Sequence, residues 1–170
     1  GIAALFDAEI TLSSTRGERT VPIAEYPLGY MTPNIEPDEI LTGVSFDLWP
    51  AGHGYDFREF AQRHGDFAIV GVGSQLTLDQ SGKIDRAAVV LIGVDDGPVR
   101  LDDVEKTLIG ETPTDDLCRA AGAMAAKRDI MGDALITADY RSRVADAFVR
   151  RSLTSAAERA QATARETADA

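Results

Sequence analysis

The chain has 170 residues, of which 44% are hydrophobic and 26% charged, enough for one ordinary domain with a buried core or two small subdomains. Its 28 acidic residues outnumber 17 basic ones, and the net charge of −11 argues against nucleic acid and anionic lipid surfaces as partners. The single cysteine, Cys118, excludes an internal disulfide framework and a cysteine-based metal cage built by this chain alone, and it favours a reducing cytoplasm.

The start of the chain has an unusual pattern. An apolar segment, Ile2 to Phe6, follows a glycine rather than a methionine and leads directly into a strand-like sequence. It lacks the basic flank and long apolar run of a signal peptide, and the chain has no stretch of eighteen apolar residues. We therefore expect neither export nor membrane insertion, and we interpret the beginning as internal to a longer chain.

The first third of the chain predicts a hairpin, a loop and a further strand. Ala8 to Ser13 and Arg19 to Ile23 have strand composition, and turn residues separate them. Four prolines punctuate the sequence that ends near Pro37, which predicts an ordered loop. Leu41 to Trp49 alternates apolar and polar residues and predicts one more strand.

The middle of the chain predicts a long antiparallel hairpin. Phe67 to Leu78 and Ile84 to Val94 are apolar strand-like runs joined by a short polar turn. Tyr55 to Arg63 is ambiguous, because its apolar residues fit both a period of two and a helical face. The sequence therefore predicts a sheet of at least three strands.

After Pro98 the hydrophobic period changes from two to 3.6. We expect a helix from Asp102 to Ile109, with Asp102 as its N-cap and Glu105 completing a capping box. Gly110 follows as the end signal of this helix.

Two more helices are expected. Thr114 is placed to cap one through about Lys127, and Thr137 to cap another from Ala138 toward Arg165. The polar, alanine-rich sequence after about Ser155 is expected to fray. With strands first and helices last, the fold class is α+β.

The search for catalytic chemistry finds little. Gly71-Val72-Gly73 follows an apolar run, but Leu76 stands where a dinucleotide loop needs its third glycine, so close strand packing is the better interpretation. His53 and His64 have no carboxylate at ligand spacing and are expected to be loop or turn residues. Cys118 is expected to be a buried, inert thiol.

Four segments carry a resemblance in the right order. They are EPDEILTGVSF (Glu36 to Phe46), FREFAQRHGDFAIVGVG (Phe57 to Gly73), GPVRLDDVEKTLIG (Gly97 to Gly110) and TADYRSRVADAFVRRSL (Thr137 to Leu153). Together they resemble the FAD-binding medium subunit of molybdenum hydroxylases, a family that includes the carbon monoxide dehydrogenase medium subunit and the flavin domain of xanthine dehydrogenase.

This resemblance implies a domain organisation. Residues 1–50 would be the end of an FAD-binding domain, and 51–170 the C-terminal domain of the medium subunit, a small antiparallel sheet with a helical bundle. The family's two glycine-rich loops that hold the FAD pyrophosphate lie upstream of the part that resembles Asp7 to Val21, in a missing N-terminal half. The resemblance also makes Tyr55 to Arg63 a strand.

The resemblance assigns four residues to FAD. Leu41 matches a position that packs on the isoalloxazine ring, where an aliphatic side chain excludes water. Arg58 stands where relatives place a cation near the pyrimidine edge, which would stabilise reduced flavin. Tyr55 would offer an aromatic face, and Asp66 would orient loops around the ring. Each residue also has a purely structural interpretation: an ordinary strand core residue for Leu41, an exposed strand cation for Arg58, a core tyrosine for Tyr55 and a turn-forming aspartate for Asp66.

Two other positions are expected to be structural. Within the family-like segment that begins at Ala138, Tyr140 is expected to be buried and Arg141 to satisfy carbonyls or an acidic partner. Gly65 is expected to permit a tight turn that Asp66 closes.

The implied function is electron transfer. A molybdopterin-binding large subunit would hydroxylate the substrate, a small subunit would carry electrons through two [2Fe-2S] clusters, and FAD in this subunit would pass them to an external acceptor. The assembly expected is a dimer of heterotrimers. The alternative is a non-catalytic docking or assembly module that has lost FAD, which the missing glycine-rich loops favour.

Overall fold

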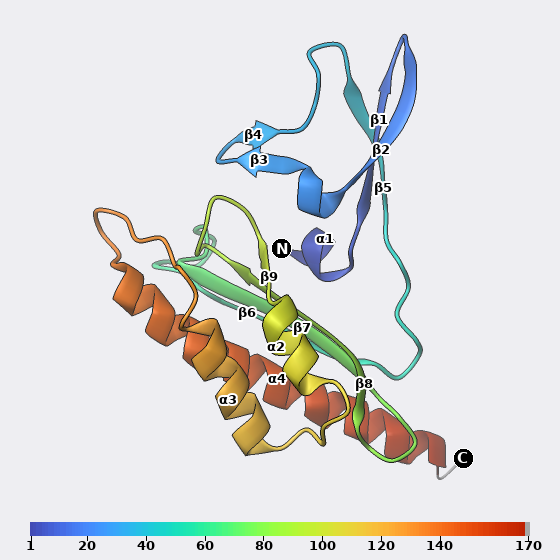
Figure 1. Ribbon diagram of the computed structural model, residues 1–170, viewed down its shortest axis with the longest axis vertical. Helices are drawn as coiled ribbons and strands as arrows, with labels where there is room; N and C mark the ends of the chain where they lie inside the picture. The colour runs from blue at the N-terminus through green and yellow to red at the C-terminus, as the bar shows by residue number, and fades with distance from the viewer. Residues whose placement is uncertain (169–170) are drawn as a thin grey trace.

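The computed structural model describes residues 1–168 as two sheet-containing units joined by an irregular linker (Figure 1). The elements of the first unit are α1 (Ile2–Leu5), β1 (Glu9–Ser14), β2 (Gly17–Pro22), the 3-10 turn η1 (Ile23–Glu25), β3 (Pro27–Gly29), β4 (Thr32–Pro33) and β5 (Ile40–Ser45). Those of the second are β6 (Gly54–Phe60), β7 (Val70–Leu78), β8 (Ile84–Ile92), β9 (Val99–Arg100), α2 (Asp102–Leu108), α3 (Asp115–Ala125) and α4 (Ala138–Ala168).

The first unit is built on a three-stranded antiparallel sheet in the order β2-β1-β5. The predicted hairpin is confirmed, and Ile10, Leu12 and Val21 form its small core. The predicted loop contains a short hairpin of its own, β3 with β4. The predicted third strand is too long: β5 ends at Ser45, because its partner β1 begins at Glu9, directly opposite, and leaves later residues without a pairing strand.

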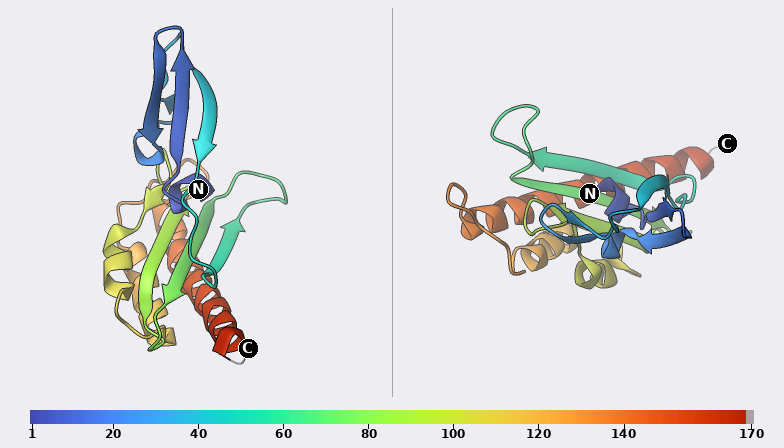
Figure 2. Two further views of the ribbon diagram at one scale, coloured as in Figure 1. Left: turned by 90° about the vertical axis from the view of Figure 1, so that its right-hand side faces the viewer. Right: turned by 90° about the horizontal axis from the view of Figure 1, so that it is seen from above.

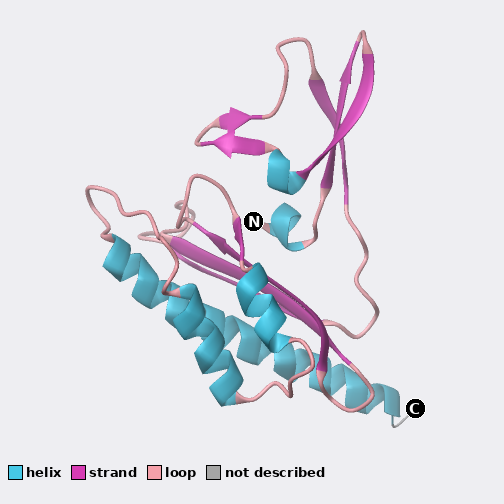
Figure 3. Cartoon of the chain, in the orientation of Figure 1, coloured by secondary structure: helices cyan, strands magenta, loops and turns pink. Residues whose placement is uncertain are grey.

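The second unit is a four-stranded antiparallel sheet in the order β6-β7-β8-β9. The predicted long hairpin is confirmed as β7 and β8, although β7 begins at Val70 rather than Phe67. The ambiguous segment is a strand, since β6 pairs with β7 along its whole length. The three helices α2, α3 and α4 cover one face of this sheet (Figures 2 and 3). The α+β fold class is therefore confirmed.

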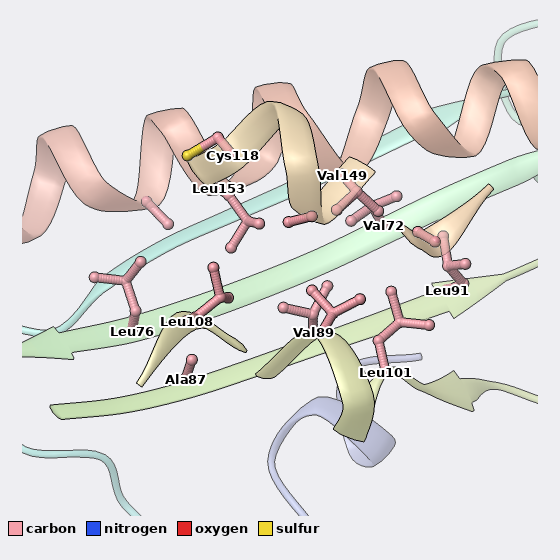
Figure 4. Close-up of a cluster of buried hydrophobic side chains, with 14 of the residues drawn as sticks. Val72, Leu76, Ala87, Val89, Leu91, Leu101, Leu108, Cys118, Val149 and Leu153 are labelled. Atoms are coloured by element: carbon pink, nitrogen blue, oxygen red, sulfur yellow. The ribbon is translucent and has the colours of Figure 1, made fainter. Parts of the chain in front are cut away.

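The main core lies between this sheet and the helices (Figure 4). Alternate residues of β7 and β8, such as Val72 and Val89, face Val149 and Leu153 of α4. Burial of such aliphatic side chains is the dominant stabilising term of the unit, at roughly 1.5–3 kcal/mol for each. No helix within residues 1–168 has both the length and the apolar character needed to cross a bilayer.

Helix α4 approaches β6 so closely that only glycine fits at Gly54. A Cβ built there would lie 1.8 Å from the carbonyl oxygen of Ala156. Ala156, Ala157 and Ala160 are buried on the same side of α4. The predicted fraying after Ser155 is therefore wrong for the described part of this segment: the small side chains that suggested a loose tail let the helix pack against the sheet, and α4 continues to Ala168. Residues 169–170, to which the same prediction applied, lie outside the described residues.

The predicted caps of α3 and α4 are confirmed, whereas that of α2 is wrong. The Thr114 hydroxyl accepts the amide hydrogen of Leu117 at 3.2 Å, and the Thr137 hydroxyl accepts that of Tyr140 at 3.3 Å. In α2 the N-cap is Leu101, with no side-chain capping bond. The predicted capping box is therefore absent, because the Glu105 carboxylate bonds residues outside α2 rather than an amide at the start of its own helix.

Glu105 instead joins the helix to the sheet and, through Arg100, to the start of the chain. Its carboxylate accepts the amide hydrogen of Val89 at 2.7 Å and pairs with the Arg100 guanidinium. Arg100 also pairs with Asp7 at 2.6 Å and donates to the carbonyl of Ala4 at 3.0 Å. Partial burial disfavours the charged guanidinium, but the two carboxylates outweigh this and raise the pKa of Arg100.

We expect Gly54→Ala to destabilise the protein by at least about 2 kcal/mol, because the added methyl group would displace the α4 backbone. Gly29→Ala is the matched control, since a Cβ at Gly29 meets nothing within 4 Å. Urea unfolding followed by circular dichroism measures both. Equal stability of the two variants would contradict the close packing of α4 on β6.

We expect Arg100→Gln to cost about 2 kcal/mol, because it leaves the largely buried Glu105 carboxylate without its cation. Arg128→Gln is the control, since its ion pair with Asp103 is more exposed and is expected to contribute under about 1 kcal/mol. Thermal unfolding compares the two. A loss for Arg128→Gln as large as that for Arg100→Gln would show that Arg100 has no special linking role.

Candidate functional site

Strand β6 presents its side chains to two different environments. Gly54, Asp56 and Arg58 point toward α4, while Tyr55 and Phe57 alternate with them and point away from the helices. This follows from the strand period of two. The two predicted flavin contacts on this strand, Tyr55 and Arg58, therefore lie on opposite faces of the sheet.

Tyr55 ends a row of three rings that we call the aromatic row: Trp49, His53 and Tyr55. The ring centroids of Trp49 and His53 lie 6.0 Å apart, and those of His53 and Tyr55 lie 5.9 Å apart. A guanidinium covers each end, with Arg86 4.2 Å from the Trp49 centroid and Arg159 5.0 Å from the Tyr55 centroid. Tyr55 keeps 57% of its surface exposed, so the row holds the ring without covering it.

A buried carboxylate holds the guanidinium that covers Tyr55. The Asp56 side chain is only 7% exposed and pairs with Arg58 at 2.6 Å and with Arg159 at 3.6 Å. Arg159 also donates to the backbone carbonyl of Tyr55. A carboxylate buried this deeply requires such cationic partners, and it fixes both arginines in return.

Arg58 is held between β6 and α4. Besides its pair with Asp56, its guanidinium donates to the Ser155 hydroxyl at 2.6 Å. It forms part of the wall of a pocket of about 300 Å³ whose other lining residues come from α3 and α4. Its guanidinium is a partly exposed cation at the outer edge of the sheet, since β6 is the edge strand.

The face of the sheet opposite the helices is apolar around Phe57. A Cβ at Gly73 would lie 3.6 Å from the Phe57 ring and 3.1 Å from Leu5 of α1, so the glycine makes room for both. Phe6 and Phe46, which follow α1 and β5 in the chain, stack edge to face with centroids 6.1 Å apart. Phe57 remains 44% exposed. This face therefore offers exposed aromatic surface on a rigid strand.

The other two predicted flavin contacts lie outside β6. Leu41 is on β5, opposite Leu12, and is 40% exposed. Asp66 is exposed in the loop between β6 and β7. The predicted turn at Gly65 is confirmed, with φ of +89°, and the Asp66 amide donates to the Arg63 carbonyl at 3.1 Å. The structure thus places Tyr55, Arg58 and Asp66 on β6 and its following loop, and Leu41 in the other sheet.

Several further predictions are resolved by the structure. Gly71 lies inside β7, where a Cβ would meet the Ile92 side chain at 2.6 Å, which confirms close strand packing. Cys118 is buried, and this burial raises the pKa of its thiol, as expected for an inert cysteine. As a separate observation, no three His, Cys, Asp or Glu side chains gather to hold a metal ion among residues 1–165, whose side chains the structure describes.

The prediction for Tyr140 is wrong and that for Arg141 is confirmed. Tyr140 is 36% exposed, because it lies on the first turn of α4, where its ring centroid is 6.2 Å from that of Phe60 and 5.8 Å from the Arg143 guanidinium. Arg141 donates to the Met131 carbonyl at 3.0 Å and pairs with Asp133. It ties the α3–α4 loop to α4.

Sequence reasoning missed Arg159, Phe57 and the packing role of His53. The alternation of Tyr55 and Phe57 was a signal for a two-faced strand, but a helical period fitted the segment equally well. Arg159 gave no signal, since it lies in the segment expected to fray. Its role depends on contacts between residues more than one hundred positions apart.

Residues 55–156 match the CO dehydrogenase flavoprotein C-terminal domain, and the chain belongs to this family. The match confirms the resemblance drawn from the sequence.

Individual relatives agree with this assignment. The chain is 35% identical to the alpha subunit of the 6-hydroxypseudooxynicotine dehydrogenase complex of Paenarthrobacter nicotinovorans, over 92% of this chain and 53% of that protein. It is 31% identical to the carbon monoxide dehydrogenase medium chain of Afipia carboxidovorans, over 93% of this chain and 54% of that protein. The chain therefore spans about half the length of these curated relatives.

A solved structure has the same fold. Reconstituted CO dehydrogenase from Oligotropha carboxidovorans matches with a TM-score of 0.85 at 28% identity, over 94% of this chain and 57% of the matched chain.

The described residues fit one end of FAD. The exposed Tyr55 ring and the half-exposed Leu41 are the kind of flat and aliphatic surface that an isoalloxazine ring contacts. In residues 1–168 no glycine-rich turn opens a helix to receive a pyrophosphate, since the Gly71–Gly73 segment continues as a strand. Of the described residues, Tyr55 and Leu41 therefore offer surface of the kind that a flavin ring contacts, whereas the Gly71–Gly73 segment is not a phosphate loop.

We expect Arg159→Gln to lower the free energy of unfolding by about 1 kcal/mol, because it removes a hydrogen bond to the Tyr55 carbonyl and one cation from the buried Asp56. Arg151→Gln, an exposed change on the same helix, is expected to have no measurable effect. Hydrogen exchange of the β6 amides should accelerate only in Arg159→Gln. Unchanged exchange would show that Arg159 does not hold this strand.

Proposed function

We propose that this chain is the C-terminal part of the FAD-binding medium subunit of a molybdenum hydroxylase, and that it passes electrons from [2Fe-2S] clusters through FAD to an external acceptor. The match of residues 55–156 to a CO dehydrogenase flavoprotein domain carries this proposal. The exposed Tyr55 and Phe57 on a rigid strand supply the surface it needs.

The work of this chain is to place and shield the flavin ring. FAD, when bound, supplies the chemistry, by accepting and releasing electrons one or two at a time. Tyr55 and Leu41 would contact the ring and exclude water from it. Electron transfer of this kind requires no acid–base residue from the chain, in agreement with the lack of a catalytic constellation in its sequence.

Arg58 and Asp66 complete the proposed site. Since β6 is the edge strand, a ring beside that edge can contact Tyr55 from one face and approach the Arg58 guanidinium from the other. A cation there would stabilise the negative charge of reduced flavin. Asp66 would position the loop that follows Gly65.

We further propose the domain boundary and the assembly. Residues 1–50 end an FAD-binding domain whose remainder holds the pyrophosphate, and 51–170 form the C-terminal domain. The partners are a molybdopterin-binding large subunit and a [2Fe-2S] small subunit, in a dimer of heterotrimers. The single, buried and unpaired Cys118 supports a reducing, cytoplasmic location.

The test is the visible absorption spectrum of the complex that co-purifies with this chain, recorded with Tyr55→Ala and with Tyr30→Ala as control. Tyr30 is also well exposed but lies between β3 and β4, away from β6. We expect a flavin band that bleaches on reduction, with at least about tenfold weaker FAD binding in Tyr55→Ala only, since aromatic contacts contribute on this scale.

Two outcomes would contradict the proposal. Equal FAD affinity of Tyr55→Ala and Tyr30→Ala would show that Tyr55 does not contact FAD. A colourless complex that also takes up no added FAD would favour a docking or assembly module without flavin.

A further inference from the structure

Arginines from three elements gather at a pocket of about 300 Å³ on the helix side of β6, which we call the arginine pocket. Its residues are Arg58 of β6, Asp115 and Arg119 of α3, and Arg150, Arg151, Thr154, Ser155 and Glu158 of α4. Four arginines line the pocket beside two carboxylates, in a chain with a net charge of −11, and two of the four arginines pair with carboxylates outside the lining.

Two of these arginines are available to a ligand. Arg58 is engaged with Asp56 and Ser155, and Arg119 pairs with Asp116 at 2.5 Å on the exposed surface of α3. Arg150 and Arg151, by contrast, form no ion pair with any residue in the range 1–165, whose side chains the structure describes. Their charge is therefore not compensated by a direct partner.

The two carboxylates of the pocket offset part of the arginine charge without pairing directly with Arg150 or Arg151. Asp115 lies in the first turn of α3, where its negative charge compensates the positive end of the helix dipole. Glu158 lies two turns beyond Arg151 on α4 and pairs with no arginine in the described chain. Both carboxylates repel anions, so a ligand is expected to approach from the Arg150 side.

The remaining lining favours a phosphate group. Thr154 and Ser155 lie one turn along α4 from Arg150 and Arg151. The Thr154 hydroxyl donates to the Arg150 carbonyl at 3.0 Å, whereas the Ser155 hydroxyl accepts from Arg58 and keeps its own hydrogen for a ligand. Guanidinium forks with neighbouring hydroxyls match the tetrahedral, multiply charged oxygens of phosphate. A volume of about 300 Å³ exceeds that of a lone phosphate and lies at the lower end of ligand pockets.

We propose that the arginine pocket binds the phosphate group of a small phosphate-bearing ligand, through Arg150 and Arg151 with the Ser155 hydroxyl at their side. The pocket lies on the face of β6 opposite Tyr55 and shares only Arg58 with the proposed flavin site, and Arg58 is already engaged with Asp56 and Ser155. The inference rests on the pocket alone and does not require the proposed electron-transfer function.

The test is titration of the purified chain, together with any partners that co-purify, with inorganic pyrophosphate, ADP and citrate, followed by calorimetry at two salt concentrations. We expect saturable pyrophosphate binding with a Kd of about 1 mM or tighter. Arg150→Gln with Arg151→Gln should weaken it at least tenfold. Arg63→Gln with Lys106→Gln removes the same charge from exposed positions outside the pocket and should leave it unchanged within about twofold.

Each outcome decides the proposal. Tighter binding of ADP than of pyrophosphate would support a nucleotide as the source of the phosphate, and the reverse a free phosphate ligand. Equal weakening in both double variants, stronger binding of citrate, or no saturable binding would overturn it. Circular dichroism verifies folding, and the single variants Arg150→Gln and Arg151→Gln give a second reading, since each should weaken binding severalfold.

Discussion

The close approach of α4 to β6 is the constraint on which the rest of the second unit depends. It requires Gly54 on the strand and the buried Ala156 and Ala160 on the helix, since any larger side chain would separate the two backbones. Because β6 has only one strand neighbour, β7, this contact provides its second support. It also brings α4 arginines within reach of the strand, which no pairing within the sheet could do.

The two faces of β6 consequently serve two different environments. On one face Tyr55 stands exposed in the aromatic row, and on the other Arg58 and Asp56 lie between sheet and helix. The buried Asp56 carboxylate connects them, because Arg159 reaches from α4 around the strand to the Tyr55 ring. The orientation of a residue proposed to contact flavin thus depends on a helix that lies behind the sheet.

The elements that sequence reasoning predicted well are those determined by local patterns. The β7–β8 hairpin has long alternating apolar runs, and Thr114 and Thr137 are caps that need only their own first turn. Predictions were wrong where contacts with residues distant in the sequence override the local pattern. Glu105 matched a capping box but is drawn to Arg100 and the Val89 amide, and the alanine-rich end of α4 is ordered by the glycine at position 54. The family resemblance identified the class of domain, yet no pattern revealed which side of β6 each site residue would occupy.

The Arg159 bond to the Tyr55 carbonyl has a consequence for the behaviour of the protein in a crowded solution. An edge strand with free carbonyl and amide groups is a template onto which a strand of another molecule can add, and chains that pair in this way aggregate. Arg159 occupies one of those carbonyls, and the charges of Asp56 and Arg58 lie along the same strand. The side chains that position Tyr55 therefore also protect β6 against intermolecular strand addition.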